Sequence, residues 1–202
     1  MILGLIPSRL NSTRLREKPL LEIDGLPIIV HTLKRALLSK KLDKVIVCTD
    51  HYKIYDLVKK HGGEAIITSS KHINGTERIA EVAKKFKTRL VVDIQGDEPL
   101  VDPNDIDKVI NFHLKNSHYD IIVPSMLTRN PERNSLVKVI FNEKGKVLYF
   151  SRSAVPYDYK KQKIQYYKDL SVVSFKKEAL NKFSKLKMSK LEKIEGIELL
   201  EL

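Results

Sequence analysis

The chain has 202 residues, of which 42% are hydrophobic and 31% charged, and this composition suits a single domain of ordinary size. It contains no run of about 18 apolar residues and does not begin with a basic stretch before an apolar segment, which argues against a membrane span and a signal peptide. The one cysteine, Cys48, rules out a disulfide framework, so a cytoplasmic protein is expected.

The formal net charge of +12 raises the possibility of a nucleic-acid partner. However, the basic residues do not form a stripe interleaved with aromatic side chains, and much of the excess is lysine spread along helical faces, with seven lysines between Lys176 and Lys193. That pattern is typical of a solvated surface, so nucleic acid is not expected as a partner.

Apolar strands alternate with amphipathic helices through the first hundred residues. Strands are predicted at 2–6, 44–50, 64–68 and 89–95, because each of these segments is short and almost continuously apolar. Helices are predicted from Pro27, through 54–58 as far as the glycine pair 62–63, and after the segment 72–76. The alternation predicts an α/β fold, a layered sandwich with a mainly parallel sheet.

The pattern changes beyond residue 120. Strands are predicted at 120–127 and 170–175, a hairpin at 137–151 with "NEKG" as its turn, and a loop rich in lysine and tyrosine at 157–168. Two helices should end the chain, the last running through "SKLEKIEGIELLEL" with Gly196 inside it, at a cost of about 1 kcal/mol relative to alanine. We expect a single domain over 1–202, with a core at 1–118 and a second region at 119–202.

Ligands of open α/β sheets bind beyond the carboxyl ends of the strands. The segments at that edge are 7–18, the residues from Asp50 on, 68–76 and 95–99. These are also the segments with unusual chemistry, which makes this edge of the sheet the predicted site.

The segment "IPSRLNSTRLREKPL" places Arg9, Arg14 and Lys18 directly after the first strand. Guanidinium and ammonium groups neutralise phosphate well, and because no glycine lies between Pro7 and Lys18, side chains would have to do more of the binding than in a glycine-rich phosphate loop. A solvated basic loop would have the same composition, and the spacing leaves both interpretations open.

The segment "DIQGDEPL" places Gln95, Gly96, Asp97 and Glu98 where the fourth strand ends. Gly96 permits a sharp turn or a close approach, and Asp97 could hold Mg²⁺, which prefers carboxylate and phosphate oxygens. Glu98 precedes a proline and could instead fix the turn. An acidic turn that caps a helix is the alternative for the segment, and Asp102 fits that role better.

The segment "HINGTERIA" places Asn74, Gly75 and Thr76 at a helix start, where either Asn74 or Thr76 could be the N-cap. Free N–H groups at such a start can bind a phosphate or the edge of a base. An ordinary cap would explain Thr76, but it would not explain Arg78, since the helix dipole disfavours a cation there.

Together these segments resemble the 3-deoxy-manno-octulosonate (Kdo) cytidylyltransferases, the CMP-Kdo synthetase family. The matching pieces also include "VCTDH", "GGEAIITSSKHINGTER", "VKVIFNEKGKVLYFSRSAVPY" and "LEKIE", and they cover almost the whole chain in order. The resemblance implies an α/β nucleotidyltransferase sandwich of three layers, in which 1–118 is the nucleotide-binding core and 119–202 the sugar-side region that also builds a homodimer.

The resemblance also implies an activity and a set of site residues. CTP would donate CMP to the anomeric hydroxyl of Kdo and release pyrophosphate, for lipopolysaccharide biosynthesis. Arg9, Arg14 and Lys18 would hold the triphosphate, and Asp97 would carry Mg²⁺ as the cofactor. The residues expected around the cytosine are Asn74, Gly75, Thr76 and Gln95, with Arg78 nearby, and those expected on the sugar side are Lys138, Ser151 and Arg152.

The chain departs from the family pattern on the sugar side. Asp169 stands where the family usually has a histidine, Ser171 where it has a glycine, and "ELLE" (198–201) where it has "EQLR". The family also continues into a "GVDT"-like segment, whose aspartate completes the metal site, beyond the point where this chain stops. Two further hypotheses therefore stay open: activation of a related 2-keto-3-deoxy sugar acid, such as an amino-Kdo or a nonulosonic acid, and a catalytically impaired nucleotide-binding remnant.

Overall fold

The computed structural model describes residues 1–11 and 15–201, and it divides the chain into two compact units. Unit 1 consists of residues 1–122 and 171–185, and unit 2 consists of residues 123–170 and 186–202. The sequence predicts one domain whose second region begins at residue 119. The structure differs, because the segment 171–185 returns to unit 1. That segment includes a strand that adds to the main sheet, so its apolar side chains are buried there.

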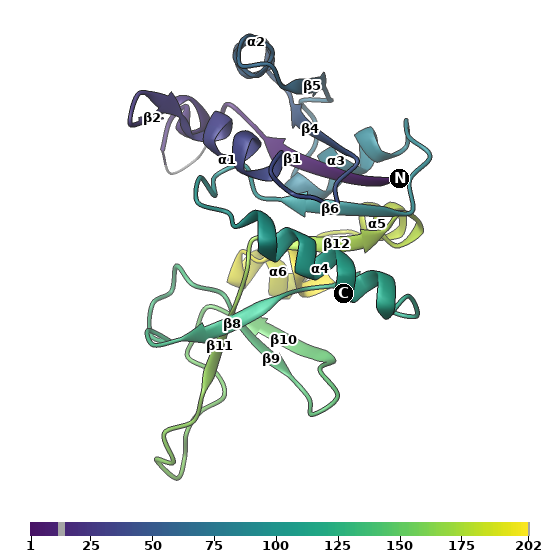
Figure 1. The fold of residues 1–202 in the computed structure, drawn as a ribbon. Helices are drawn as coiled ribbons and strands as arrows, with labels where there is room; N and C mark the ends of the chain where they lie inside the picture. The colour runs from purple at the N-terminus through teal and green to yellow at the C-terminus, as the bar shows by residue number, and fades with distance from the viewer. Residues whose placement is uncertain (12–14, 202) are drawn as a thin grey trace. The chain divides into compact units, whose positions relative to one another are not determined.

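Within the described residues of unit 1, a six-stranded sheet has the order β5-β4-β1-β6-β12-β7 (Figure 1). Four strands are parallel, as predicted: β1 (Ile2–Ser8), β4 (Lys44–Thr49), β5 (Glu64–Ile67) and β6 (Leu90–Ile94). The strand β12 (Val172–Lys176) runs antiparallel between β6 and β7 (Ile121–Ile122). The carboxyl ends of the four parallel strands therefore meet at one edge of the sheet.

Helices cover both faces of this sheet. Buried side chains of α1 (Ile28–Ala36), α2 (Tyr52–Lys60) and α4 (Pro103–Lys115) join one hydrophobic cluster with strand residues that include Val47 and Val92. The other face of the strands, which includes Leu5 and Val91, lies toward α3 (Gly75–Ala83) and α5 (Lys177–Phe183). The result is the three-layer α/β sandwich that the sequence predicts.

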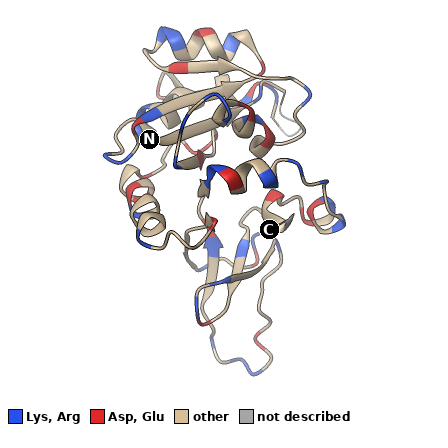
Figure 2. Ribbon diagram, turned by 90° about the vertical axis from the view of Figure 1, so that its right-hand side faces the viewer, with Lys and Arg blue, Asp and Glu red and all other residues tan. Residues whose placement is uncertain are grey.

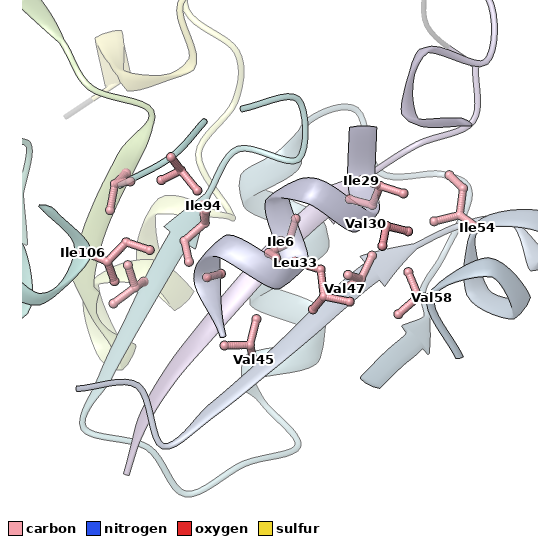
Figure 3. Packing of buried hydrophobic residues seen from close by; sticks show 14 of the residues in the cluster. Ile6, Ile29, Val30, Leu33, Val45, Val47, Ile54, Val58, Ile94 and Ile106 are labelled. Atoms are coloured by element: carbon pink, nitrogen blue, oxygen red, sulfur yellow. The ribbon is translucent and has the colours of Figure 1, made fainter. Parts of the chain in front are cut away.

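The core under α1 follows from the helical spacing of apolar residues in the sequence (Figure 3). Ile29, Val30 and Leu33 lie on one stripe of the helix, and all three are fully buried against Ile6 and Val47 of the sheet. Burying side chains of this size stabilises the fold by roughly 1.5–3 kcal/mol each, before the cost in entropy.

A small antiparallel ribbon precedes α1 in unit 1. A 3-10 turn at Lys18–Leu20 leads into β2 (Glu22–Ile23) and β3 (Leu26–Pro27), which pair with each other. Pro27 then directly precedes the first helix, in agreement with the prediction that it opens that helix.

Unit 2 contains a separate antiparallel sheet, whose order in the described residues is β10-β9-β11-β8. The predicted hairpin is confirmed as β9 (Lys138–Phe141) and β10 (Val147–Ser151), with a turn in which Gly145 has φ 75°. A short helix, α6 (Lys190–Glu195), and a 3-10 turn at Glu198–Glu201 complete the unit.

Two strand predictions in this part of the chain need correction. The single strand predicted at 120–127 is interrupted at Val123 and Pro124, so it becomes β7 in unit 1 and β8 (Ser125–Thr128) in unit 2. The loop predicted at 157–168 is also too long. Its last residues form β11 (Tyr166–Asp169), because this segment pairs with β8 and β9, which are distant in sequence.

The prediction for the last helix was wrong as well. Gly196 does not lie inside a helix: α6 ends at Glu195, and Gly196 caps it in the left-handed conformation with φ 61° and ψ 43°. Its N–H donates to the Glu192 carbonyl at 2.7 Å. Glycine adopts this conformation without the steric cost of a Cβ atom, so the residue expected to weaken the helix is the one that ends it.

Among the described residues, no helix is both long and apolar enough to cross a membrane. Lysine and arginine are scattered along helices, strands and loops, with acidic residues between them (Figure 2). This distribution agrees with the interpretation of the positive charge as a solvated surface.

The packing of α1 predicts a contrast between two leucines. Leu33 is fully buried, whereas Leu38, five residues later, is 61% exposed. Leu33→Ala should lower the free energy of unfolding by about 2–5 kcal/mol, because it removes contacts and leaves a cavity. The matched change Leu38→Ala should alter it by less than about 0.5 kcal/mol. Urea denaturation of both variants tests this, and equal losses would contradict the packing described for α1.

Candidate nucleotide site at the carboxyl edge of the sheet

The candidate site lies at the edge of unit 1 where β1, β4, β5 and β6 end. Four segments follow these strand ends: the basic loop after β1, Asp50 after β4, the residues from Thr68 after β5, and Gln95–Glu98 after β6. The sequence predicts that these segments meet. The hydrogen bonds described below join each of them to another segment at this edge.

The basic loop is tied to the end of β6 by one ion pair. The Lys18 ammonium lies 2.5 Å from the Asp97 carboxylate, and both side chains remain accessible to solvent. Arg9 is exposed directly after β1. Arg14, the third predicted phosphate ligand, lies outside the described residues. The structure thus brings together the residue predicted to bind phosphate and the one predicted to bind Mg²⁺.

Arg78 does not extend into solvent, although a charged side chain commonly does. Its side chain is 3% exposed, and its guanidinium donates to the Asp50 carboxylate at 2.9 Å, to the Thr68 hydroxyl at 2.6 Å and to the Ser69 carbonyl at 3.3 Å. These bonds offset the unfavourable position of a cation in the first turn of α3. Arg78 therefore connects the ends of β4 and β5 to the helix, and these contacts explain the cation that the sequence analysis found out of place at the helix start.

The same ion pair reaches the loop after β1. The second oxygen of the Asp50 carboxylate accepts the Leu10 N–H at 3.4 Å. Asp50 thus stands between Arg78 and the beginning of the basic loop, and it fixes the direction in which the backbone leaves β1.

The start of α3 is capped by Asn74. Its side-chain oxygen accepts the Glu77 N–H at 2.9 Å, and the Glu77 carboxylate accepts the Ile73 N–H at 3.0 Å, so the two side chains hold the turn from both directions. This decides between the two cap candidates in favour of Asn74. Gly75 and Thr76 form the first turn, where Thr76 is buried.

The loop before α3 is fastened to the helix by a second group of charges. The His72 ring lies 2.6 Å from the Glu81 carboxylate, which also accepts the Ser69 N–H at 2.9 Å. Burial opposes ionisation of Glu81, but the bonds from Ser69 and His72 outweigh it and hold its pKa below the ordinary value. The loop from Ser69 to Asn74 is therefore held at both of its ends.

The turn after β6 is narrow because Gly96 lies against the first strand. A Cβ atom on Gly96 would come within 2.6 Å of the Pro7 carbonyl oxygen. The sequence analysis considered a sharp turn or a close approach at Gly96. The structure shows a close approach, between Gly96 and the backbone of β1. Glu98 has the predicted turn role: its N–H donates to the Gln95 carbonyl, and its carboxylate accepts the Ser171 hydroxyl at 2.8 Å.

Gln95 is partly buried at the end of β6, with a nitrogen of its carboxamide 3.2 Å from the Asp93 carboxylate. Asp93 lies inside the strand and is 4% exposed. The sequence analysis overlooked Asp93, although a carboxylate inside the apolar run "VVDI" is a signal, because buried charges need partners.

Cys48 lies in the middle of the sheet at β4 and is fully buried. Burial, with a contribution from the Asp93 charge, raises the pKa of its thiol far above the ordinary value. It is a structural thiol, as predicted, and takes no part in the chemistry of the edge.

The predicted sugar-side residues all lie in unit 2, where they hold the backbone together. Lys138 is fully buried, and its ammonium donates to the carbonyls of Arg133 at 3.0 Å, Leu136 at 2.7 Å and Arg152. Those three bonds use all of its protons. Burial lowers the pKa of Lys138, and the nearby Arg152 charge acts in the same direction.

Ser151 and Arg152 share one partner, Glu195 of α6. The Glu195 carboxylate accepts the Ser151 hydroxyl and the Arg152 N–H, both at 2.8 Å. The Arg152 guanidinium donates to the carbonyls of Glu195 at 2.6 Å, Asn134 at 2.9 Å and Gly196 at 3.0 Å. Arg152 thereby joins the end of the helix to the hairpin, and the sequence analysis did not identify Glu195 as its partner.

The buried ion pair predicts a stability effect. Arg78→Met should lower the free energy of unfolding by about 3 kcal/mol, because it leaves the Asp50 carboxylate without its counter-ion. The control Lys108→Met breaks an exposed pair with Asp105 and should cause no measurable change. Chemical denaturation compares the two variants, and similar losses would mean that Arg78 does not support the edge.

Comparison with known proteins agrees with this architecture. The cytidylyltransferase family model matches residues 3–202. Among curated proteins, the 3-deoxy-manno-octulosonate cytidylyltransferase of Leptospira biflexa is 37% identical over 201 residues, covering 98% of this chain and 81% of the relative. That of Fusobacterium nucleatum is 39% identical over 200 residues, covering 97% of this chain and 81% of the relative.

Solved structures give the same result. A CMP:2-keto-3-deoxy-manno-octonic acid synthetase, determined in complex with CTP, is 33% identical and superposes with a TM-score of 0.93 over 100% of this chain and 84% of its own. A cytidylyltransferase from Leptospira borgpetersenii shares the fold at a TM-score of 0.64 and 21% identity, covering 95% of this chain and 66% of its own. The chain described here belongs to the cytidylyltransferase family, among the 3-deoxy-manno-octulosonate cytidylyltransferases.

Proposed function

We propose that this protein is a nucleotidyltransferase that moves CMP from CTP to the anomeric hydroxyl of Kdo, releases pyrophosphate and serves lipopolysaccharide biosynthesis. The observation that carries the proposal is the superposition of the whole chain on a synthetase solved with CTP, at 33% identity. The Lys18–Asp97 pair supports it, because it places a cation and a carboxylate at the edge of the sheet where ligands bind.

In this reaction the protein mainly has to position the substrates and neutralise their charge. The sugar hydroxyl attacks the α-phosphorus as the bond to the pyrophosphate breaks, and little covalent work falls on the protein. Arg9, Arg14 and Lys18 would neutralise the triphosphate, and Lys18 would stabilise the charge that develops on the pyrophosphate. Arg9 is exposed and Lys18 is reachable from solvent, as this role requires.

Asp97 would hold Mg²⁺. Among the described residues, no group of three or more His, Cys, Asp or Glu side chains could form a complete cage for a metal ion. That fits Mg²⁺, which commonly takes one or two carboxylates and completes its shell with water and substrate phosphates. When bound, the ion would supply charge neutralisation at the phosphates, and Asp97 would set its place beside Lys18.

The cytosine end of CTP would lie where α3 begins. Asn74, Gly75 and Thr76 form that turn, and Gln95 directly follows β6. Arg78 acts here through Asp50 and the loop after β5, because its guanidinium is already engaged there.

The sugar-side assignment rests on Lys138, Ser151 and Arg152. Ser151 and Arg152 share the Glu195 carboxylate, so a bound sugar acid would compete with it for their donors. Lys138 would contribute through the backbone that it holds, since its protons are donated to carbonyl groups.

A related 2-keto-3-deoxy sugar acid is the alternative substrate. Ser171, one of the departures from the family pattern, donates its hydroxyl to Glu98 and its carbonyl accepts the Gln95 N–H at 3.1 Å. A side chain that stands where the family has glycine thus stabilises the turn after β6. This departure from the family pattern is the observation that supports the alternative substrate.

Two further parts of the proposal are a homodimer and a cytoplasmic location. The four-stranded sheet of unit 2 exposes the large apolar side chains Met126, Leu127 and Leu148, which supports burial against a second copy. Light scattering coupled to size exclusion would measure the assembly, and a monomer at micromolar concentration would contradict the dimer.

The function is tested by one assay. The purified protein is incubated with CTP, Mg²⁺ and a panel of keto-deoxy sugar acids, and pyrophosphate release is measured. We expect release with Kdo. Release only with an aminated Kdo or a nonulosonic acid would support the alternative, and no release with any sugar would agree with an impaired remnant.

Lys18→Ala should lower kcat by about 10²–10³-fold, because it removes a donor aimed at the developing charge. The fold should persist, since the pair with Asp97 lies at the surface. The matched control Lys44→Ala breaks a lysine pair with Glu64 at the start of β4 and should leave kcat unchanged. A rise in the KM for CTP alone would show uniform binding and not a role in the transition state.

CTP should be preferred over UTP and ATP. Stabilisation by a ligand rises with its affinity for the folded state, so CTP should raise the melting temperature more than the other nucleotides at equal concentration. Thermal-shift titration in the presence of Mg²⁺ makes the comparison. Equal shifts with ATP would contradict the small pyrimidine pocket expected beside Gln95.

A further inference from the structure

The carboxamide of Gln95 is held in one orientation by a residue of the strand that it follows, β6. Asp93 lies in β6 and Gln95 directly follows its last residue, two positions further on, so the alternation of the strand turns both side chains to the same face of the sheet. A carboxamide nitrogen of Gln95 lies 3.2 Å from an oxygen of the Asp93 carboxylate.

The chemistry of this contact distinguishes the nitrogen of the Gln95 carboxamide from its oxygen. The Gln95 atom that faces Asp93 is the NH₂ nitrogen, which donates to a carboxylate oxygen. The carboxamide oxygen is then turned away from Asp93. Within the part of the chain that the structure describes, this oxygen has no hydrogen-bond partner, and the Gln95 side chain is partly exposed.

Both side chains lie on the face that α3 covers. Val92 and Ile94, the alternate residues of β6, belong to the cluster under α1 and α4, so Asp93 and Gln95 point to the opposite face. The helix α3 contacts β1, β4 and β6 from that side and begins at the same edge of the sheet. The carboxamide oxygen of Gln95 thus lies on the face of the sheet that α3 covers, at the edge where α3 begins.

We propose that Asp93 is a positioning residue, which fixes the Gln95 carboxamide with its oxygen toward the base and so selects cytosine over uracil. This inference rests on the proposed function, in which a pyrimidine lies beside Gln95. Cytosine carries an exocyclic amino group, a donor, where uracil carries a carbonyl oxygen. A fixed acceptor bonds the first and repels the second, and discrimination of this polar kind is strong.

Burial makes Asp93 suited to this task. The residue is 4% exposed, and it pairs with Leu5 of β1 on one side and with Val173 of β12 on the other, so its backbone is held from both sides. A buried carboxylate is costly unless it is hydrogen-bonded, which favours an orientation of Gln95 that donates to it.

The test compares kcat/KM for CTP and for UTP, with Kdo, Mg²⁺ and pyrophosphate release as the readout. In Asp93→Asn the new amide can donate or accept, so Gln95 can turn over and offer its NH₂ group to uracil. The CTP-to-UTP ratio should fall by about 5- to 150-fold, the effect of one hydrogen bond made or left unmade. A purely structural loss would lower both values together and leave the ratio unchanged.

Further variants keep the test decisive. Gln95→Ala should reduce the ratio by a similar factor, and adding Asp93→Asn to it should change the ratio no further, because Asp93 acts through Gln95. If Asp93→Asn fails to fold, Asp93→Ser also removes the fixed acceptor with a smaller side chain. The control Asp120→Asn, an exposed residue paired with Lys176, should keep the wild-type ratio.

Three results would overturn the inference: an unchanged ratio in Asp93→Asn, an unchanged ratio in Gln95→Ala, or a further loss when Asp93→Asn is added to Gln95→Ala. Failure of the proposed function would look different, since the wild-type protein would then release no pyrophosphate from CTP with any sugar acid. In that case thermal-shift titrations with CTP and UTP measure the preference through binding alone, and the same pattern across the variants is expected.

Discussion

The edge of the sheet depends on one buried guanidinium. Arg78 bonds Asp50 after β4, Thr68 and Ser69 after β5, and belongs itself to α3, so one side chain joins three segments that the backbone connects only through loops. Asp50 in turn accepts the Leu10 N–H, which connects the loop after β1 to the same group of contacts. Because parallel strands end at the same edge without bonding one another there, such a cross-link gives the loops a common frame on which nucleotide-binding side chains can be held.

Much of unit 1 could be predicted from the sequence, because its strands are continuously apolar and its helices carry one apolar stripe, as in α1 with Ile29 and Leu33. That Lys18 and Asp97 lie at this edge could also be predicted, since the segments that carry them follow strand ends. What could not be predicted depends on contacts distant in sequence. The strand at Tyr166–Asp169 forms only because β8 and β9 lie beside it, and the role of Arg78 requires knowing that Asp50 faces it.

Gly196 shows a different limit. A glycine between two apolar segments is compatible with a helix interior and with a helix end, and only the backbone angles decide between them. In unit 2 the residues predicted to lie on the sugar side are likewise compatible with two roles. Lys138 and Arg152 donate to the backbone carbonyls around them, so residues expected to contact a substrate also hold together the hairpin and the end of α6.

The ion pair of Lys18 with Asp97 has a consequence for how ligands enter. Each partner neutralises the other, so neither Lys18 nor Asp97 presents an unpaired charge to an approaching ion. A bare triphosphate would approach a carboxylate, and a bare divalent cation would approach an ammonium. A complex of the two would meet neither obstacle, because its phosphates would pair with Lys18 while Asp97 would hold its cation. In the proposed function, the pair would therefore act as an exchange site that admits a metal–nucleotide complex in preference to its separate parts.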